Sequence, residues 1–150
     1  MTDIIGKLIA IIIAFILIVI FPFTVITIDS DMKVRMRVEN EVQRAIDEII
    51  DSRQYSKSQI EDLNLSLAGL GPTFDVEVER YIRTIDPDPD QPGKTYISYI
   101  KSEDNSVYER GDKVIVHVKA LGFTGQQRVL YTLVHYMLPT IDVQLAGRVR

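Results

Sequence analysis

The sequence contains no cysteine and no tryptophan among its 150 residues, and it has only two histidines. Without cysteine, the chain can form neither a disulfide nor a thiolate nucleophile, and a cysteine-ligated metal site is excluded as well. Basic residues do not outnumber acidic ones, since the formal net charge at pH 7 is −4. Proteins whose main partner is a nucleic acid usually present a basic face or stripe, so we expect no nucleic-acid partner.

The short motifs of common enzyme chemistries are also missing. The chain has no glycine-rich phosphate loop, no H-E-x-x-H and no G-x-S-x-G. His117 falls in an expected strand and His135 in an expected apolar helix, and neither lies in a recognisable nucleophile setting. We therefore expect no enzyme activity, no catalytic residue and no cofactor.

One long hydrophobic run is present near the N-terminus. Residues 8–28, LIAIIIAFILIVIFPFTVITI, contain 21 residues without a charge. As a helix they would be about 31 Å long, which matches the hydrocarbon core of a membrane. Signal peptides have shorter apolar regions and end at a small-residue cleavage site, which this run lacks. We expect a membrane-spanning helix that stays on the mature protein. Pro22 predicts a kink, or a helix that curves or loosens where it packs beside copies of itself.

The charges that flank this run do not decide its orientation. Lys7 and the terminal amine lie on the short side, and four basic residues follow on the other side: Lys33, Arg35, Arg37 and Arg44. The positive-inside rule would keep the large domain in the cytoplasm, but it weakens for long translocated domains. Charge alone leaves the orientation open.

Residues 29–52 have the pattern of an amphipathic helix. Apolar residues recur at intervals of three and four, which predicts one buried face. The residues of this face are Met32, Met36, Val42, Ile46, Ile49 and Ile50, widened by Val38 and Ala45. Because Pro22 is the only helix breaker in the way, we expect one helix over about residues 4–52, about 70 Å long. A stripe of this kind most often packs on the protein's own domain.

Two shorter helices are expected after it. Ser58 and Glu61 form an S-x-x-E capping box, which predicts a helix over 59–69 that ends at GLGP, residues 69–72. Residues 128–138 carry apolar residues at helical spacing, so they predict a short helix, although the same residues would suit a strand.

Alternation of apolar with polar residues, and stretches rich in β-branched and aromatic residues, predict strands over 74–85, 95–100, 113–120 and 141–149. We expect these strands to form an antiparallel sheet of about four strands laid against the amphipathic helix. The predicted fold class is α+β: a long N-terminal hydrophobic-then-amphipathic helix packed on a small antiparallel sheet. We divide the chain into a transmembrane or filament-core helix, residues 1–28, and an extracytoplasmic α+β domain, residues 29–150.

The loop DPDPDQPG at 86–93 is the one candidate metal site. Asp86, Asp88 and Asp90 repeat at every second position, as they do in calcium loops. The glycine and the final glutamate of the helical calcium loop are missing, so the pattern favours a solvated proline-rich turn and predicts no metal. The tripeptide Arg110-Gly111-Asp112 matches a cell-adhesion sequence, but its position favours the turn that begins the next strand.

Two short strand motifs add to this layout. Gly111-Asp112 precedes Val114, Val116 and Val118, and the last strand contains Leu145, Ala146 and Arg148. With the single hydrophobic helix in front, the chain resembles type IV pilins and, more narrowly, the TadE-like pseudopilins of tight-adherence pilus systems. Processed pilins are cut at a small residue and carry a glutamate five residues later. Here Gly6 is the candidate cleavage site, and the glutamate position is Ile11.

The resemblance implies a structural subunit of a cell-surface filament, or of its assembly machine, that polymerises through the hydrophobic helix. The partners would be copies of the chain and other pilus-machine subunits, with the membrane holding the helix before assembly. The C-terminal domain would lie outside the cytoplasm, at the cell surface. The residues expected to pack in the oligomer core are Ile9, Ala10, Ile13, Ala14, Leu17, Ile20, Phe21, Pro22 and Val25. The alternative is a single-pass membrane-anchored domain that binds an envelope partner or ligand.

Overall fold

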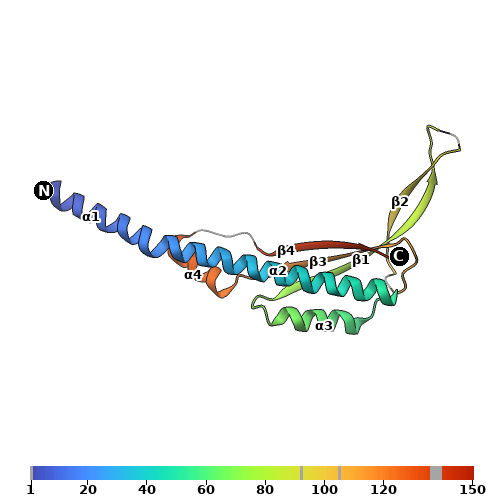
Figure 1. Ribbon diagram of the computed structural model, residues 1–150, viewed down its shortest axis with the longest axis horizontal. Coiled ribbons are helices and arrows are strands. Elements are labelled where there is room, and N and C mark those ends of the chain that lie inside the picture. The colour runs from blue at the N-terminus through green and yellow to red at the C-terminus, as the bar shows by residue number, and fades with distance from the viewer. Residues whose placement is uncertain (1, 92, 105, 136–139) are drawn as a thin grey trace.

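The computed structural model describes residues 2–91, 93–104, 106–135 and 140–150. A long helix begins at the N-terminus and continues along one side of a four-stranded sheet (Figure 1). In chain order the elements are α1 (Thr2–Phe15), the π-helix η1 (Ile16–Ile20), α2 (Phe21–Ser52), α3 (Lys57–Ala68), β1 (Phe74–Pro87), β2 (Thr95–Ser102), β3 (Lys113–Ala120), α4 (Gly125–Val134) and β4 (Asp142–Arg148). The α+β fold expected from the sequence is confirmed.

The first three elements join without a break into one helix from Thr2 to Ser52, as the sequence predicts. The helix ends at Arg53, whose φ of 53° is left-handed. The chain is then held against the loop before β3: the N–H of Tyr108 donates to the carbonyl of Arg53 at 3.0 Å, and the N–H of Tyr55 donates to that of Ser106 at 3.2 Å. The C-terminal end of the long helix is therefore fixed to the sheet domain.

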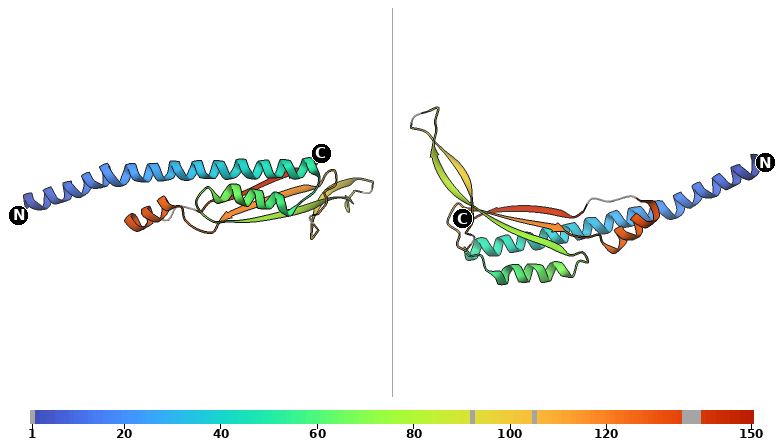
Figure 2. Two further views of the ribbon diagram at one scale, coloured as in Figure 1. Left: turned by 90° about the horizontal axis from the view of Figure 1, so that it is seen from below. Right: turned by 180° about the vertical axis from the view of Figure 1, so that it is seen from behind.

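The sheet is antiparallel with the strand order β2-β1-β3-β4. The long strand β1 serves two partners, since residues 74–81 pair with β3 and residues 80–87 pair with β2. Only its first part lies over the helices. Its second part and β2 form a two-stranded arm, residues 82–91 and 93–100, that projects beyond the end of α2 (Figures 1 and 2). All four predicted strands are confirmed to within two residues at each end.

The core lies between the inner face of the sheet and the helices α2 and α3. On β3, alternate side chains point into it, as the period of a strand requires. Burial of each large apolar side chain contributes about 1.5–3 kcal/mol, so this face is the main stabilising contact of the domain. The buried members are Val38, Val42, Ala45, Ile46, Ile49, Leu63, Leu67, Tyr108, Val114, Val116, Val118, Ala120, Ile141, Val143 and Val149.

The N-terminal end of the predicted apolar stripe is wrong. Met32 and Met36 are 58% and 52% exposed, whereas Val34 and Val38 face the sheet. Met36 precedes Val42 by six residues, and at about 100° per residue the two side chains lie about 120° apart around the helix. Both methionines therefore belong to the outer face.

The predicted capping box is also wrong. Helix α3 is capped two residues earlier, by Ser56 and Gln59. The Oγ of Ser56 accepts from the N–H of Gln59 at 3.3 Å, and the Oε1 of Gln59 accepts from the N–H of Ser56 at 2.9 Å. Ser58 lies inside the helix. The sequence contains two overlapping boxes, S-x-x-Q and S-x-x-E, and the motif alone does not choose between them.

Residues 125–134 form α4, so the helical alternative holds for this stretch, and residues 136–138 lie outside the described residues. The Oγ1 of Thr124 and the Nε2 of Gln127 donate to the carboxylate of Asp31 at 3.2 and 2.7 Å. Leu130 is buried. Two views place α4 beyond the end of the sheet, alongside the N-terminal part of α2 (Figures 1 and 2). Asp31 thus attaches α4 to the long helix.

Gly147 allows β4 to approach α2 closely, which gives a test of the packing. A β-carbon at position 147 would overlap Cγ2 of Ile46 and come within 2.6 Å of Cδ1 of Ile50. We expect Gly147→Ala to lower the free energy of unfolding by about 1–3 kcal/mol. The control is Gly122→Ala, because a β-carbon there meets nothing within 4 Å. Thermal unfolding followed by circular dichroism measures both, and equal stabilities for the two variants would contradict the packing.

Candidate functional site

The apolar part of the long helix is not covered by the rest of the chain. Within the described residues, one helix, Ile4–Ser52, is long and apolar enough to cross a membrane. Its most apolar stretch of 18 residues contains no buried residue. A helix that formed the core of a soluble domain would be mostly buried, so this surface is available to lipid or to another protein.

The residues predicted to pack in an oligomer lie on this surface. Eight of the nine are exposed, and Ile20 is half-buried. The exposed ones are Ile9, Ala10, Ile13, Ala14, Leu17, Phe21, Pro22 and Val25. The side chains are therefore available for contact outside the subunit.

A π-helical turn precedes Pro22. The N–H of Phe21 donates to the carbonyl of Ile16, five residues back, where an α-helix would use the fourth. Pro22 lacks an N–H, and its ring would clash with the carbonyl four residues earlier in a regular α-helix. The wider turn gives that ring room. Next to it, the hydroxyl of Thr24 donates to the carbonyl of Ile20 at 2.8 Å, as threonine does beside proline in membrane helices.

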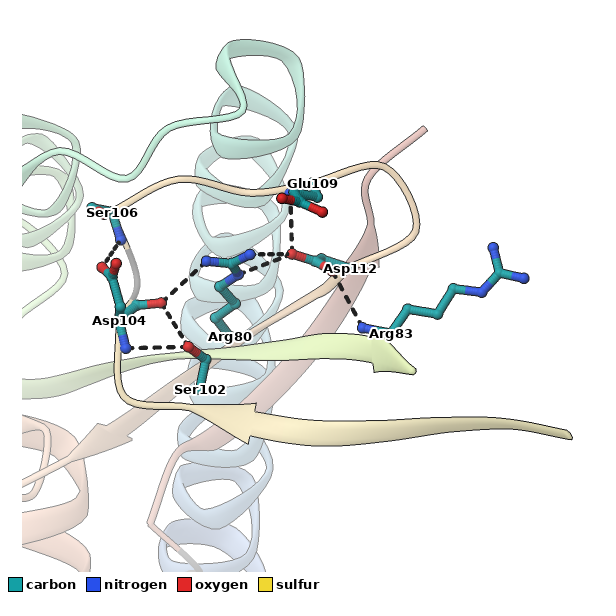
Figure 3. Close-up of polar contacts among 7 residues, drawn as sticks. All are labelled: Arg80, Arg83, Ser102, Asp104, Ser106, Glu109 and Asp112. Atoms are coloured by element: carbon teal, nitrogen blue, oxygen red, sulfur yellow. Dashed lines mark hydrogen bonds and ion pairs between the residues drawn. The ribbon is translucent and has the colours of Figure 1, made fainter. Parts of the chain in front are cut away.

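The aspartate of the tripeptide at 110–112 is buried at the base of the arm (Figure 3). The Oδ2 of Asp112 accepts a hydrogen bond from Nε of Arg80 at 2.9 Å and forms an ion pair with its Nη2 at 2.7 Å, and both side chains are almost fully buried. The carboxylate also accepts from two backbone N–H groups, those of Glu109 at 3.1 Å and Arg83 at 3.3 Å. All of its oxygens are engaged within the molecule.

This arrangement makes the tripeptide a structural turn. Gly111 has a φ of 103°, and its N–H donates to the carbonyl of Val149 at 2.9 Å, while the N–H of Val149 donates to the carbonyl of Asp112 at 2.9 Å. The prediction of a turn that begins the next strand is confirmed. Since the carboxylate of Asp112 already binds Arg80, it is not free for the contact that an adhesion tripeptide makes.

Tyr108 completes the buried cluster. The guanidinium of Arg80 lies 5.4 Å from the centre of its ring, a cation–π distance. Burial raises the pKa of Tyr108 to about 12, and within the described part of the chain its hydroxyl has no hydrogen-bond partner. Nη1 of Arg80 also donates to the carbonyl of Asp104 at 3.4 Å. Arg80 therefore joins β1 to both ends of the loop between β2 and β3.

The acidic loop forms the tip of the arm. The N–H of Asp90 donates to Oδ1 of Asp88 at 2.9 Å, and the carboxylate of Asp86 accepts from the hydroxyl of Ser98 across the two strands. Among the described residues, no group of three His, Asp or Glu side chains is placed to hold a metal ion. The structure gives these aspartates roles in a hairpin turn.

The two histidines lie far from one another in the fold. Nε2 of His117 lies 2.7 Å from Oδ1 of Asp142, on the exposed face of the sheet. His135 caps the end of α4 with a left-handed φ of 52°, and its ring centre is 5.8 Å from that of Tyr131. The structure thus places one in contact with an aspartate on the surface of the sheet and the other at a helix terminus.

The sequence did not predict a cleft of about 1260 Å³ that lies between the end of α2, the base of the arm and the end of β4. Its arginines come from separate parts of the chain, so no local motif marks them. They are Arg53, Arg83, Arg110, Arg148 and Arg150, and Asp47 and Asp51 lie in the same cleft. Nε of Arg83 is buried and has no partner among the described residues. An excess of arginine favours an anionic ligand.

Asp112 provides a second test. In Asp112→Ala the guanidinium of Arg80 remains buried without its counter-ion, so we expect a loss of about 3–5 kcal/mol in the free energy of unfolding. Arg110→Ala, in the same tripeptide but not part of the ion pair, is the matched control and should change stability by less than about 0.5 kcal/mol. Chemical denaturation of the two variants measures the difference. If the first variant were as stable as the second, the ion pair would not be the structural centre described here.

Comparisons with protein-family models, with characterised proteins and with solved structures find no match for this chain. The resemblance to pilins therefore stays with the layout and the short motifs that carry it. What the chain does has to be argued from its own surfaces: the apolar helix, the projecting arm and the arginine-lined cleft.

Proposed function

We propose that the protein is a pilin-like structural subunit that polymerises through its N-terminal helix. In this proposal residues 8–28 lie in a membrane before assembly, and residues 29–150 lie outside the cytoplasm. Copies then associate through residues 8–28 into a cell-surface filament. The observation that carries the proposal is an exposed, uncharged helix that continues without a break into the core helix of a folded domain.

The apolar surface of residues 8–28 suits both a membrane and the core of a filament. Each large apolar side chain removed from water contributes about 1.5–3 kcal/mol, which opposes release of the helix as a soluble monomer. Lipid and protein neighbours both remove it from water, so the choice between them depends on the closeness of helix packing. Ala10 and Ala14 are small residues four apart on one face, where two helices can approach.

The π-helical turn supports a helix that adapts on packing. Ile16–Ile20 is the one segment of the long helix that departs from α-helical hydrogen bonding. Such turns are less regular than the flanking α-helix and often occur at functional sites. A change in this turn would reorient residues 2–15 relative to the domain without disturbing the core around Val38 and Ile46.

The partners in this proposal are other copies of the chain and the remaining subunits of a type IV or tight-adherence assembly machine. The arm gives the exposed domain a second surface. It carries four exposed apolar side chains on two strands that no helix covers, Ile85, Tyr96, Ile97 and Ile100. A two-stranded ribbon is only marginally stable alone, so neighbours in a filament would stabilise it.

Ala14→Leu tests the proposal. The added bulk on the packing face should cost about 1–3 kcal/mol per contact, which raises the concentration needed for assembly by about tenfold or more. Ile12→Leu is the control, because Ile12 is exposed, is not one of the predicted packing residues and lies about 160° around the helix from Ala14. Negative-stain microscopy of the full chain after detergent removal counts the filaments. Equal assembly of the two variants, or wild-type protein that remains a detergent-bound monomer, would refute the proposal.

The arginine-lined cleft favours a second candidate function, a membrane-anchored domain that binds an anionic partner. Arg148→Ala removes one cation from the cleft and should weaken binding of full-length protein in detergent to immobilised polyglutamate by about tenfold, the value of one charge-assisted hydrogen bond. Arg128→Ala on α4 lies outside the cleft and should leave binding unchanged. Absence of binding, or equal weakening by both substitutions, would count against this function.

A further inference from the structure

Helix α4 lies at the level where the apolar run of the long helix ends. The uncharged run, residues 8–28, ends at Ile28. Asp31, which binds α4 to α2, lies three residues later. From that anchor α4 runs alongside the N-terminal part of α2, away from the sheet (Figures 1 and 2). Within the apolar run, Thr27 of α2 is the buried residue, and Leu130 is buried on α4. The two helices therefore pack beside the end of the apolar run.

The length of α4 fixes how far it extends along that run. Ten residues of helix are about 15 Å long, and the distance from Asp31 back to Ile28 is about 4.5 Å. If the two axes are roughly parallel, the far end of α4 lies about 10 Å beyond Ile28 along the apolar segment. A membrane that surrounds residues 8–28 would therefore reach α4 as well. This depth is that of the boundary between headgroups and acyl chains, about 5–10 Å, which α4 would enter end-on and not by lying in the plane of the bilayer.

The exposed residues of α4 suit such a position. Val129 and Tyr131 are 48% and 42% exposed and flank the buried Leu130 at about 100° on either side. They therefore border the contact with α2, where lipids around a membrane span would touch them. Arg128 and Thr132 lie on the outer face, and Arg128, near the start of α4, lies at about the level of Ile28, where headgroups would begin. Tyrosine is enriched at membrane interfaces because its ring is apolar and its hydroxyl is polar.

We propose that α4 is a membrane-interface helix, with Val129 and Tyr131 at the acyl-chain boundary and Arg128 among the headgroups. It fixes the depth and the rotation at which the domain sits on the bilayer, because Asp31 holds it to the spanning helix. The inference rests on the membrane placement in the proposed function and is independent of filament assembly.

The absence of tryptophan from the chain permits a direct test. Full-length Tyr131→Trp carries one reporter and is reconstituted at one copy per nanodisc, with either ordinary or brominated phosphatidylcholine. We expect brominated lipid to reduce its emission relative to ordinary lipid, because an indole at a depth of about 5–10 Å reaches the acyl chains that carry the bromine. Tyr96→Trp in the arm, where the native residue is 50% exposed, is the matched control and should keep its full emission. Val129→Trp reports independently from the other side of the helix.

Phe15→Trp, in the middle of the apolar run, separates the possible failures. Quenching of Phe15→Trp without quenching at positions 131 and 129 would overturn the inference and leave membrane insertion intact. Emission at position 131 that shifts to shorter wavelength only when many copies assemble, with no bromine quenching, would show that a second copy covers α4, and would also overturn it. Absence of quenching at position 15 would refute the membrane placement itself.

Discussion

One continuous helix has an exposed apolar part and a part that packs in the core of the domain, and the rest of the structure depends on this constraint. From Thr2 to Ser52 there is no break at which the chain could turn. The first part presents apolar side chains in every direction, whereas the second part packs one apolar face into the core between the sheet and α3. Because α2 is one uninterrupted α-helix, residues 21–28 are rigidly joined to the core of the domain, whereas η1 separates residues 2–15 from it. Three contacts hold the domain to the long helix: those of Asp31 with α4, of Gly147 with Ile46 and Ile50, and of Arg53 with Tyr108.

The buried ion pair holds the other end of the molecule. Arg80 lies on β1 where the strand leaves the core sheet and enters the arm. Its partner Asp112 lies in the turn before β3, so their contact fixes the angle between arm and domain (Figure 3). A buried charge is costly without a partner, and the ion pair with Arg80 together with three hydrogen bonds to Asp112 offsets that cost. The tripeptide Arg110-Gly111-Asp112 thus has a structural role, because its aspartate holds β1 at the base of the arm.

The fold was largely predictable, because its signals are local or periodic. The uncharged run and the lack of any helix breaker other than Pro22 between this run and Ser52 specify the long helix, and the alternation of apolar and polar residues specifies the strands. The errors arose where the pattern was ambiguous: Met32 and Met36 are apolar but out of phase with Val42, and two capping boxes overlap at Ser56. The apolar surface of the candidate site was predictable for the same reason as the helix. The cleft was not, since Arg53 and Arg148 meet only after the chain has folded.

The position of α4 also limits how copies of the helix can meet. Phe23 and Thr24 are half-buried and Thr27 is fully buried, so one side of the helix near α4 is already occupied by its own chain. Residues 4–15, before η1, have no such cover, and their side chains are exposed all round. A neighbouring helix can therefore approach residues 9–17 from any direction but residues 20–27 only from the side away from α4. The π-helical turn lies between these two zones, where a helix must adjust if one half is held by the domain and the other by its neighbours.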